Sequence, residues 1–515
     1  IHRRRAQGKR GGCGEKDKEL TWGGLETLRS EQFGSARVGN DACESRGVSR
    51  RHSSGVAAVK ARTQRRDADQ GFCATAISPS PDAKGTRDSV ETVPEADSLL
   101  KLVLNRDNVL EAWKRVKANG GAPGVDGRSI DDSSDFIRSH WLSIPRRIEE
   151  GHYRPSPVRR TEIPKGNGET RPLGIPTVLD RMIQQALAQV LVPIFDPGFS
   201  DHSYGFRPGR SASHAVHWIE KHIREGKSWA IDIDLSKFFD RVDHDLLMER
   251  VGRKVKDKQV LKLIGRFLRA GVEVDGAVHP TQLGVPQGGP LSPLLANIML
   301  DDLDKEMELR GHTFSRYADD FVILVSSQKA ANRVMGRLRS YITTRLKLVV
   351  NETKSKVVPS TQAKFLGFTF TRKKIRWTEK SFLDFRHRIR ELTKRNWGVS
   401  IEYRISKINE YIRGWMGYFQ ISQFYSPVEH IDEWIRRRLR ACFLKQWRKA
   451  RTRVRNLIRL GVKKGDAIKT GSSGKSYWRL SKTIATNCGL SIAAFQDYGL
   501  ISVRDMWINF HYSKG

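Results

Sequence analysis

The stretch that decides the fold is residues 314–325, Phe-Ser-Arg-Tyr-Ala-Asp-Asp-Phe-Val-Ile-Leu-Val. Two adjacent acids, Asp319 and Asp320, stand immediately before an uninterrupted apolar run at 321–325. This run has the length and the β-branched character of a buried strand. Carboxylates that enter a buried strand are costly unless they are paired or bound to a metal ion. Taken alone, an Asp-Asp pair is typical of an ordinary hairpin turn, so its chemistry depends on what the rest of the chain brings to it.

A second acidic segment covers residues 230–244, Ala-Ile-Asp-Ile-Asp-Leu-Ser-Lys-Phe-Phe-Asp-Arg-Val-Asp-His. Strand alternation places Asp232 and Asp234 on one face and the neighbouring aliphatic residues on the other. Carboxylates from two different strands can hold two Mg²⁺ ions about 4 Å apart, one activating an attacking 3′-hydroxyl and the other stabilising a leaving pyrophosphate. The two acidic segments together therefore indicate a nucleotidyl-transfer site.

The elements expected across residues 160–370 alternate irregularly between strand and helix, which is an α+β pattern. The sequence predicts strands at 229–235, 321–325, 356–358 and 365–370, and helices at 179–194, 261–269 and 291–309. Apolar residues at helical spacing also predict one helix from residue 99 to Gly120, and almost everything from 379 onward is expected to be helical. The sequence has no apolar run of about 18 residues, which excludes a membrane-spanning chain.

The net charge of +35 is unevenly distributed along the 515 residues. Residues 371–515 carry 32 basic and 11 acidic side chains, and so hold 21 of the 35 net charges. They also hold seven of the twelve Trp residues. A balance this basic calls for a polyanionic partner, most simply nucleic acid, with an anionic membrane surface as the lesser option. The Trp side chains suit either a helical core or base stacking beside phosphate contacts.

Three features of the sequence bear on the order of its N-terminal part and on the compartment in which the protein works. Residues 1–95 are rich in Gly, Ser, Arg, Asp and Ala without sustained periodicity, which predicts a disordered extension. The sequence begins at Ile1 rather than Met, which is expected of a fragment or of translation from upstream sequence. The five Cys residues are isolated, which argues against a zinc ribbon or a disulfide framework and favours a reducing cytoplasm, expected to be bacterial.

Six short segments, in order between residues 105 and 370, resemble the reverse transcriptase domain of group II intron-encoded proteins. They are Gly121–Gly127 (GAPGVDG), Lys165–Pro176 (KGNGETRPLGIP), Ser203–Ser211 (SYGFRPGRS), Asp234–Asp240 (DLSKFFD), Gln287–Pro293 (QGGPLSP) and Tyr317–Asp320 (YADD). The resemblance implies an α+β right-hand polymerase followed by an α-helical thumb or maturase domain. Its parts would be N-terminal helices and fingers over 96–230, a palm over 231–371, the maturase domain over 379–450 and a basic extension over 451–515.

The resemblance also assigns roles to the acids of the palm. Asp234 and Asp319 would bind two Mg²⁺ ions per active site, and Asp320 would support the site as its third catalytic carboxylate. Phe239 would be a steric gate whose ring excludes a 2′-hydroxyl and so favours deoxynucleotides. A plain core Phe is the alternative at that position.

Four further residues would contact the nucleotide. Lys165 and Arg171 flank a Gly-rich turn and would close on the triphosphate, unless the turn is only a solvated hairpin. Gln287 would line the nucleotide pocket, and the two glycines after it would let backbone approach the primer-template. Lys354 matches a lysine thought to protonate pyrophosphate, although a surface lysine fits nearly as well. The segment Phe365–Phe368 would form the primer-grip hairpin.

The segment Ile412–Phe419, Ile-Arg-Gly-Trp-Met-Gly-Tyr-Phe, is similar to the maturase region of the same family. Apolar residues at helical spacing predict one buried stripe, formed by Ile405, Ile408, Ile412, Trp415 and Phe419. RNA binding would fall to basic side chains that follow: Arg436, Arg437, Arg438, Arg440, Lys445, Arg448 and Lys449. The region beyond 450 offers only Cys488 and His511 as paired-ligand candidates, so no metal-dependent endonuclease is expected.

The resemblance implies an RNA-directed DNA polymerase that binds its own intron RNA, assists splicing and copies the intron by target-primed synthesis. Its partners would be intron RNA, primer-template, target DNA and dNTPs, with no membrane. Three alternatives stay open. They are another bacterial reverse transcriptase for defence or diversity generation, a viral-type RNA polymerase, and a splicing-only maturase. The Gly-Trp and Tyr-Phe pairs disfavour the first, Phe239 the second, and the intact acids the third.

Overall fold

The computed structural model describes residues 98–164, 170–371 and 374–513. The expected disordered extension over 1–95 and the nucleotide-binding candidate Lys165 lie outside the described residues. Among the helices that are described, none is long and apolar enough to cross a membrane.

The N-terminal helices show one departure from the expected elements. The single helix predicted from residue 99 to Gly120 is two helices, α2 (Leu99–Leu104) and α3 (Arg106–Asn119). Asn105 separates them because its backbone is extended and its side chain accepts the N–H of Asp107, which caps α3. Apolar periodicity continues across the break, so the prediction of one helix was wrong. Helices α4 (Ile130–His140) and α5 (Ser143–Glu149) follow.

A four-stranded sheet lies on the N-terminal side of the polymerase core. Its order is β2-β1-β4-β5, formed by β1 (Val158–Pro164), β2 (Thr170–Ile175), β4 (Val272–Val274) and β5 (Ala277–His279). Strands β1 and β2 are antiparallel, with Arg171 opposite Ile163. This hairpin carries the basic residue expected at the triphosphate.

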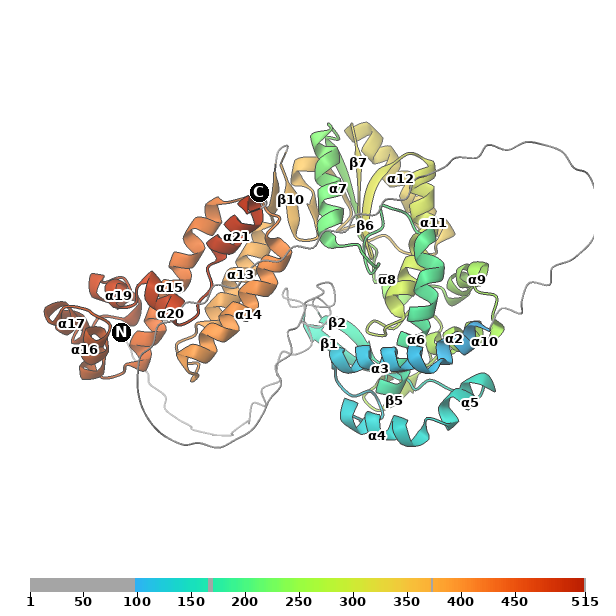
Figure 1. The fold of residues 1–515 in the computed structure, drawn as a ribbon. Helices are drawn as coiled ribbons and strands as arrows, with labels where there is room; N and C mark the ends of the chain where they lie inside the picture. The colour runs from blue at the N-terminus through green and yellow to red at the C-terminus, as the bar shows by residue number, and fades with distance from the viewer. Residues whose placement is uncertain (1–97, 165–169, 372–373, 514–515) are drawn as a thin grey trace, which may run out of the picture. The chain divides into compact units, whose positions relative to one another are not determined.

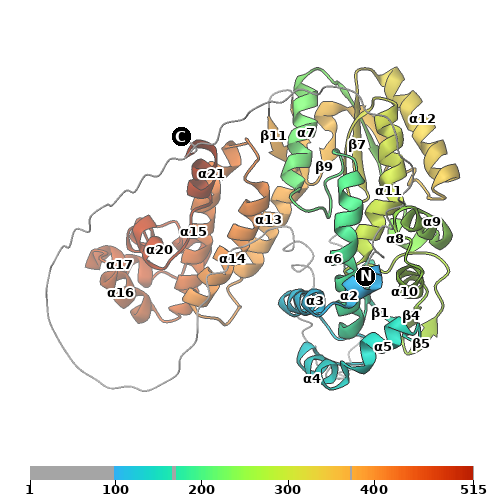
Figure 2. The same cartoon turned by 45° about the vertical axis from the view of Figure 1, so that its right-hand side comes forward.

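The central sheet is antiparallel, with the order β6-β7-β3-β8. Its strands are β3 (Trp229–Ile233), β6 (Thr313–Tyr317), β7 (Asp320–Val325) and β8 (Lys356–Pro359). Helix α7 (Ala212–Arg224) covers one face and α12 (Gln328–Arg345) the other, as Figures 1 and 2 both show. The strands predicted at 229–235, 321–325 and 356–358 are therefore confirmed within a residue or two.

Alternation along the strands sorts side chains between these two faces. Ile231 and Ile233 join the core beneath α12, whereas Ala230 joins the separate cluster beneath α7. Asp232 and Asp234 alternate with the aliphatic residues and so face the same side of the strand as Ala230. Both acids are half-buried, while the aliphatic residues beside them are buried. The predicted separation of acids and aliphatics on β3 is confirmed.

The remaining elements of the polymerase region surround this sheet. They are α6 (Val178–Phe195), η1 (Asp196–Gly198), α8 (Phe238–Arg241), α9 (His244–Lys254), α10 (Lys258–Leu268), α11 (Ser292–Leu309) and η2 (Ser360–Gln362). A third sheet of order β11-β10-β9 follows, with β9 (Lys364–Phe365), β10 (Phe368–Phe370) and β11 (Ile375–Trp377). The expected hairpin at Phe365–Phe368 is present, turning at Leu366 and Gly367, whose φ angles are both positive. The single strand predicted at 365–370 was therefore wrong, because this turn divides it into β9 and β10.

The C-terminal region is helical, as expected. Its helices are α13 (Glu379–Leu392), α14 (Ile401–Phe419), α15 (Ser426–Gln446), α16 (Ala450–Arg459), α17 (Lys464–Gly471), α18 (Tyr477–Leu480), α19 (Ile484–Gly489), α20 (Ile492–Asp497) and α21 (Val503–Tyr512). The predicted apolar stripe of α14 is buried from Ile405 to Trp415 and partly buried at Phe419. Trp377, Trp415 and Trp507 are core residues, whereas Trp478 is 37% exposed.

Candidate active site

The acidic pair of the YADD segment lies at a tight hairpin turn. Tyr317, the last residue of β6, pairs with Asp320, the first residue of β7, so Ala318 and Asp319 form a two-residue turn. Ala318 has a φ of +57°, the positive value that such tight hairpins require at their first central residue. Gly205 packs against this turn so closely that a Cβ there would lie 2.4 Å from the Ala318 nitrogen. The turn is therefore fixed both by its own geometry and by the neighbouring 203–209 segment.

The pairing register brings the third acid to the same place. Ile233 at the end of β3 pairs with Phe321 of β7. The next position in this antiparallel register sets Asp234 opposite Asp320, and their parity points both toward the same face. Asp234 and Asp320, 86 residues apart in the sequence, therefore lie close together at the end of the sheet, where their charges act on one another.

The carboxylates affect one another electrostatically. Asp320 reaches solvent at the edge of the site, but the protein around its carboxyl desolvates it and raises its pKa to about 7, helped by the charges of Asp319, Asp232 and Asp234. Burial also raises the pKa of Asp319, with Asp234 adding to the rise and Arg171 opposing it. Acids crowded in this way hold their protons unless a cation compensates them.

The donor set suits a hard cation that is shared with a substrate. Within the described residues, no group of three or more His, Cys, Asp or Glu side chains is arranged to hold a metal ion alone. Mg²⁺ is ordinarily bound by one or two protein carboxylates together with substrate phosphates and water. Asp234 and Asp319 fit that mode, because they supply hard oxygen ligands at an open, negatively charged edge.

Arg171 is the expected triphosphate residue that the structure places at this edge. Its side chain is exposed on β2, and its charge lowers the pKa of both Asp319 and Asp320. The carbonyl of Gln287 accepts the backbone N–H of Gly174 at 2.8 Å, which joins the 287–293 segment to the same strand. The basic hairpin, the glutamine loop and the acids therefore belong to one site.

Backbone contacts hold Phe239 to the segment before Gln287 and hold the segment around Lys354 to Asp234. Phe239 is half-buried, stands edge-on to Phe238 at 5.1 Å, and its carbonyl accepts the N–H of Val285. The backbone of Asp234 donates to Ser355 Oγ and accepts the N–H of Asn351. Lys354 lies inside this tethered 351–355 segment with its side chain exposed.

The two glycines after Gln287 are explained by packing inside the protein. A Cβ at Gly288 would lie 2.6 Å from the carbonyl oxygen of Gly174, and Gly288 has a φ of +117°. A Cβ at Gly289 would lie 2.3 Å from Gln184 Oε1 on α6. The close approach that these positions require is to β2 and α6, which holds the loop against the β1–β2 hairpin.

Arg316 supports the YADD turn and was not predicted as a site residue from the sequence. Arg316 is fully buried and donates to the carbonyl of Ala318, to Asn297 Oδ1, to Ser203 Oγ and to Asp304. A lone Arg immediately before the turn, on a strand with a buried face, was the available signal. Its partners are up to 113 residues away, so pattern alone did not reveal them.

The basic residues of α15, and of positions 448 and 449 just beyond its end, differ in their exposure. Lys445, Arg448 and Lys449 are exposed, and the three arginines at 436–438 are half-buried. Arg440 is only 7% exposed, donates its Nε–H to the carbonyl of Leu490, and has its pKa lowered to about 10 by burial. The expected basic face therefore excludes Arg440, which links α15 to the C-terminal extension.

Two protein-family models match the chain. Residues 163–370 match the reverse transcriptase (RNA-dependent DNA polymerase) model, and residues 383–461 match the group II intron maturase-specific domain. Protein YkfC of Escherichia coli K12 is 34% identical over 322 residues, which are 55% of this chain and 84% of that protein. The group II intron-encoded protein LtrA of Lactococcus lactis subsp. cremoris is 31% identical over 353 residues, 55% of this chain and 58% of that protein.

Among solved structures, a chain of a partial Cas6-RT-Cas1–Cas2 complex is 25% identical and covers 49% of this chain and 44% of its own length. The TM-score of this match is 0.32, which is too low to support a family assignment. The site at the end of the β6–β7 hairpin is that of a reverse transcriptase, an RNA-directed DNA polymerase. The chain belongs to the family of group II intron-encoded reverse transcriptases and maturases. Such polymerases use divalent metal ions, in agreement with the donor set formed by Asp234 and Asp319.

Proposed function

We propose that this chain binds the RNA of the intron that encodes it, assists splicing of that RNA, and copies it into DNA from a primer in the target. The observation that supports the polymerase half is the pairing of Ile233 with Phe321, one residue from Asp234 and from Asp320, together with the charge of Asp234 acting on Asp319 and Asp320. The maturase half rests on the second family match over 383–461 and on the exposed cations near the end of α15, which are Lys445, Arg448 and Lys449.

In the polymerase reaction, Asp234 and Asp319 would hold two Mg²⁺ ions, and Asp320 would support the arrangement from the adjacent position. When bound, the ions would activate the 3′-hydroxyl and stabilise charge on the leaving pyrophosphate. Arg171 would receive the triphosphate, because it is a cation within electrostatic reach of both acids. Lys354 belongs to the 351–355 segment, which is bonded to the Asp234 backbone through Ser355, and would donate a proton to pyrophosphate.

Selection of deoxynucleotides would fall to Phe239. Its ring is half-buried at the end of the segment that begins with Asp234, and its carbonyl is bonded to the loop that leads to Gln287. A ring between the acids and the loop that leads to Gln287 would contact the 2′ position of a bound ribose. Gln287 would line the same pocket, together with Lys165, which lies outside the described residues.

The splicing half is tested with precursor RNA at low Mg²⁺, with and without protein. Wild-type protein is expected to raise the splicing rate, and the double variant Asp319→Ala, Asp320→Ala is expected to raise it equally, because RNA is held by the helical region. Asp131→Asn on α4, an exposed acid far along the chain from the site, is the matched control. Splicing that is indifferent to wild-type protein would contradict the maturase role and would favour a reverse transcriptase that serves another RNA.

A further inference from the structure

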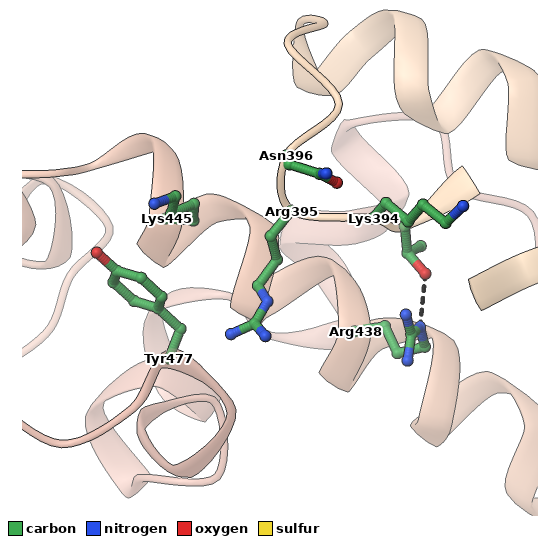
Figure 3. A pocket seen from close by; sticks show the side chains of 7 residues that line it. Lys394, Arg395, Asn396, Arg438, Lys445 and Tyr477 are labelled. Carbon is green, nitrogen blue, oxygen red and sulfur yellow. Dashed lines mark hydrogen bonds between the residues drawn. The ribbon is translucent and has the colours of Figure 1, made fainter. Parts of the chain in front are cut away.

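A basic cavity of about 520 Å³ lies in the helical C-terminal region, and none of the polymerase acids lines it. It is bordered by the segment between α13 and α14, by α15 and by α18 (Figure 3). Seven residues line it: Thr393, Lys394, Arg395, Asn396, Arg438, Lys445 and Tyr477. Its volume is in the range of small-molecule sites and is larger than a phosphate group alone needs.

The lining has one sign of charge. Among the seven described residues that form it, four are cations and none is an acid. The side chains of Lys394 and Arg395 form no hydrogen bond or ion pair with any part of the chain that the structure describes, and both are exposed. Four unneutralised cations around a hollow repel one another unless an anion enters, so the cavity is electrostatically suited to a phosphate.

Hydrogen bonds within the protein hold the backbone that forms one wall of the cavity. Arg404 is 1% exposed and donates to the carbonyls of Leu392, Lys394 and Trp397 at 2.7–3.0 Å. The Sγ–H of Cys442 on α15 donates to the carbonyl of Thr393 at 3.4 Å. The backbone of the 392–397 segment is therefore held from within, which removes an ordering cost from ligand binding.

Arg438 joins this wall to the cavity. Its Nε–H donates to Thr393 Oγ1 and its Nη2 donates to the carbonyl of Arg390. The guanidinium is thus fixed in orientation, while its Nη1 makes no hydrogen bond to the described residues. An oriented guanidinium with a donor still available is well placed to bind a phosphate oxygen.

An aromatic side chain completes the cavity. Tyr477 stands opposite Arg395 in Figure 3, and Lys445 Nζ lies 5.7 Å from the centre of its ring. The next residue, Trp478, is 37% exposed and has the guanidinium of Arg437 3.9 Å from its ring. Aromatic faces beside cations are the combination that binds single-stranded nucleic acid, because bases stack on the rings while phosphates meet the charges.

We propose that this cavity binds one nucleotide of a single-stranded nucleic-acid segment, with its phosphate between Arg395, Arg438 and Lys445 and its base against Tyr477. The inference rests on the proposed function, for which it names a subsite in the maturase region. The phosphodiester could come from intron RNA or from target DNA, and the two sources share the chemistry described.

The test is fluorescence anisotropy of the full chain with labelled single-stranded RNA and DNA of one sequence, over a series of salt concentrations. The double variant Arg395→Gln, Lys445→Gln removes two exposed cations of the cavity. Each lost phosphate contact lowers the slope of log K against log salt by about 0.7 for single strands, so the slope should fall by about 1.4 if both cations contact phosphate. Lys329→Gln, Arg333→Gln on α12, which removes two exposed charges elsewhere, should leave it unchanged.

A second pair of variants isolates the stacking contact. Tyr477→Leu should weaken binding about 5- to 100-fold without changing the salt slope, because a lost base stack carries no charge. Tyr477→Phe keeps the ring and should bind like wild type. Losses confined to RNA or to DNA identify the source of the nucleotide and support the cavity.

Two results would overturn the inference, and they are distinguishable. If wild-type protein binds RNA and extends primers but the cavity variants match the α12 control, the subsite is wrong and the proposed function stands. If wild-type protein binds neither polymer, the subsite and the proposed RNA-binding function fail together.

Discussion

Arg316 and Asp304 form an ion pair in which both side chains have no exposed surface, with Arg316 Nε 2.7 Å from Asp304 Oδ1. Asp304 belongs to α11, and Arg316 precedes the YADD turn by one residue. The same guanidinium donates to the carbonyl of Ala318 at 2.9 Å, so a helix is tied directly to the apex that carries Asp319. This pair therefore fixes the position of the turn that carries Asp319.

Breaking the pair on one side should be severe. Arg316→Met leaves the Asp304 carboxylate buried without a partner, which is expected to cost about 3–5 kcal/mol of unfolding free energy in urea titrations. Arg253→Met, which breaks a half-exposed pair with Asp302, should cost about 1 kcal/mol or less. The combined variant Arg316→Met, Asp304→Leu should regain part of the stability, because no buried charge is left alone while the other acceptors of Arg316 still lack their donor.

The combined variant also separates positioning from stability. The Ala318 carbonyl has lost its donor, so kcat for primer extension should stay well below wild type while KM for dNTP changes little. Wild-type kcat in this variant would show that the network stabilises the fold and does nothing more for the turn.

The acids should differ in the size of their effects. Asp320→Asn is expected to lower kcat about 10- to 100-fold, the range typical of residues that support a metal ligand, and to raise the Mg²⁺ concentration needed for half-maximal rate. Asp234→Asn and Asp319→Asn should lower kcat further. Steady-state extension across a Mg²⁺ titration measures both effects, and equal losses at all three positions would make Asp320 a ligand in its own right.

Phe239 and its neighbour provide a matched pair for sugar selection. Phe239→Val should reduce the preference for dNTP over rNTP about 10- to 200-fold, since the barrier to a 2′-hydroxyl is removed. Phe238→Leu, at a position that is 2% exposed, should lower stability without changing that preference. Competition of single dNTP and rNTP substrates gives the ratio, and an unchanged ratio in Phe239→Val would make Phe239 a core residue only.

Arg440, the buried arginine of α15, should contribute to the stability of the fold and not to RNA binding. Arg440→Gln removes the donor to the Leu490 carbonyl and should cost about 1–3 kcal/mol of unfolding free energy. Arg448→Gln, Lys449→Gln should leave stability unchanged but reduce the salt dependence of RNA binding. The opposite assignment of effects would restore Arg440 to the RNA-binding face.

Most of the palm could be predicted from sequence because its signals are local. Period-two alternation at 229–235 and an apolar run after Asp320 define two strands, and the known pairing of such strands brings the acids together. The C-terminal helices are equally readable from their apolar stripes. The resemblance to a known family then supplied the chemistry that neither pattern states.

What the sequence did not show depends on distant or competing contacts. Asn105 caps α3 and ends α2, although apolar residues continue at helical spacing on both sides of it. Arg440 looks like one more charge in a basic run, but segments 50 residues further along cover it. Arg316 pairs with α11 and with Ser203, and only the folded chain brings these together.

The central claim is that Asp234, Asp319 and Asp320 form one polymerase site. It is tested most directly by single-turnover extension of a DNA primer on an RNA template, with dNTPs and Mg²⁺, at protein concentrations that saturate RNA binding. Wild-type protein should give full-length DNA, and Asp319→Ala, Asp320→Ala protein should bind the template equally well and give none. Extension by the double variant at the wild-type rate would contradict the claim.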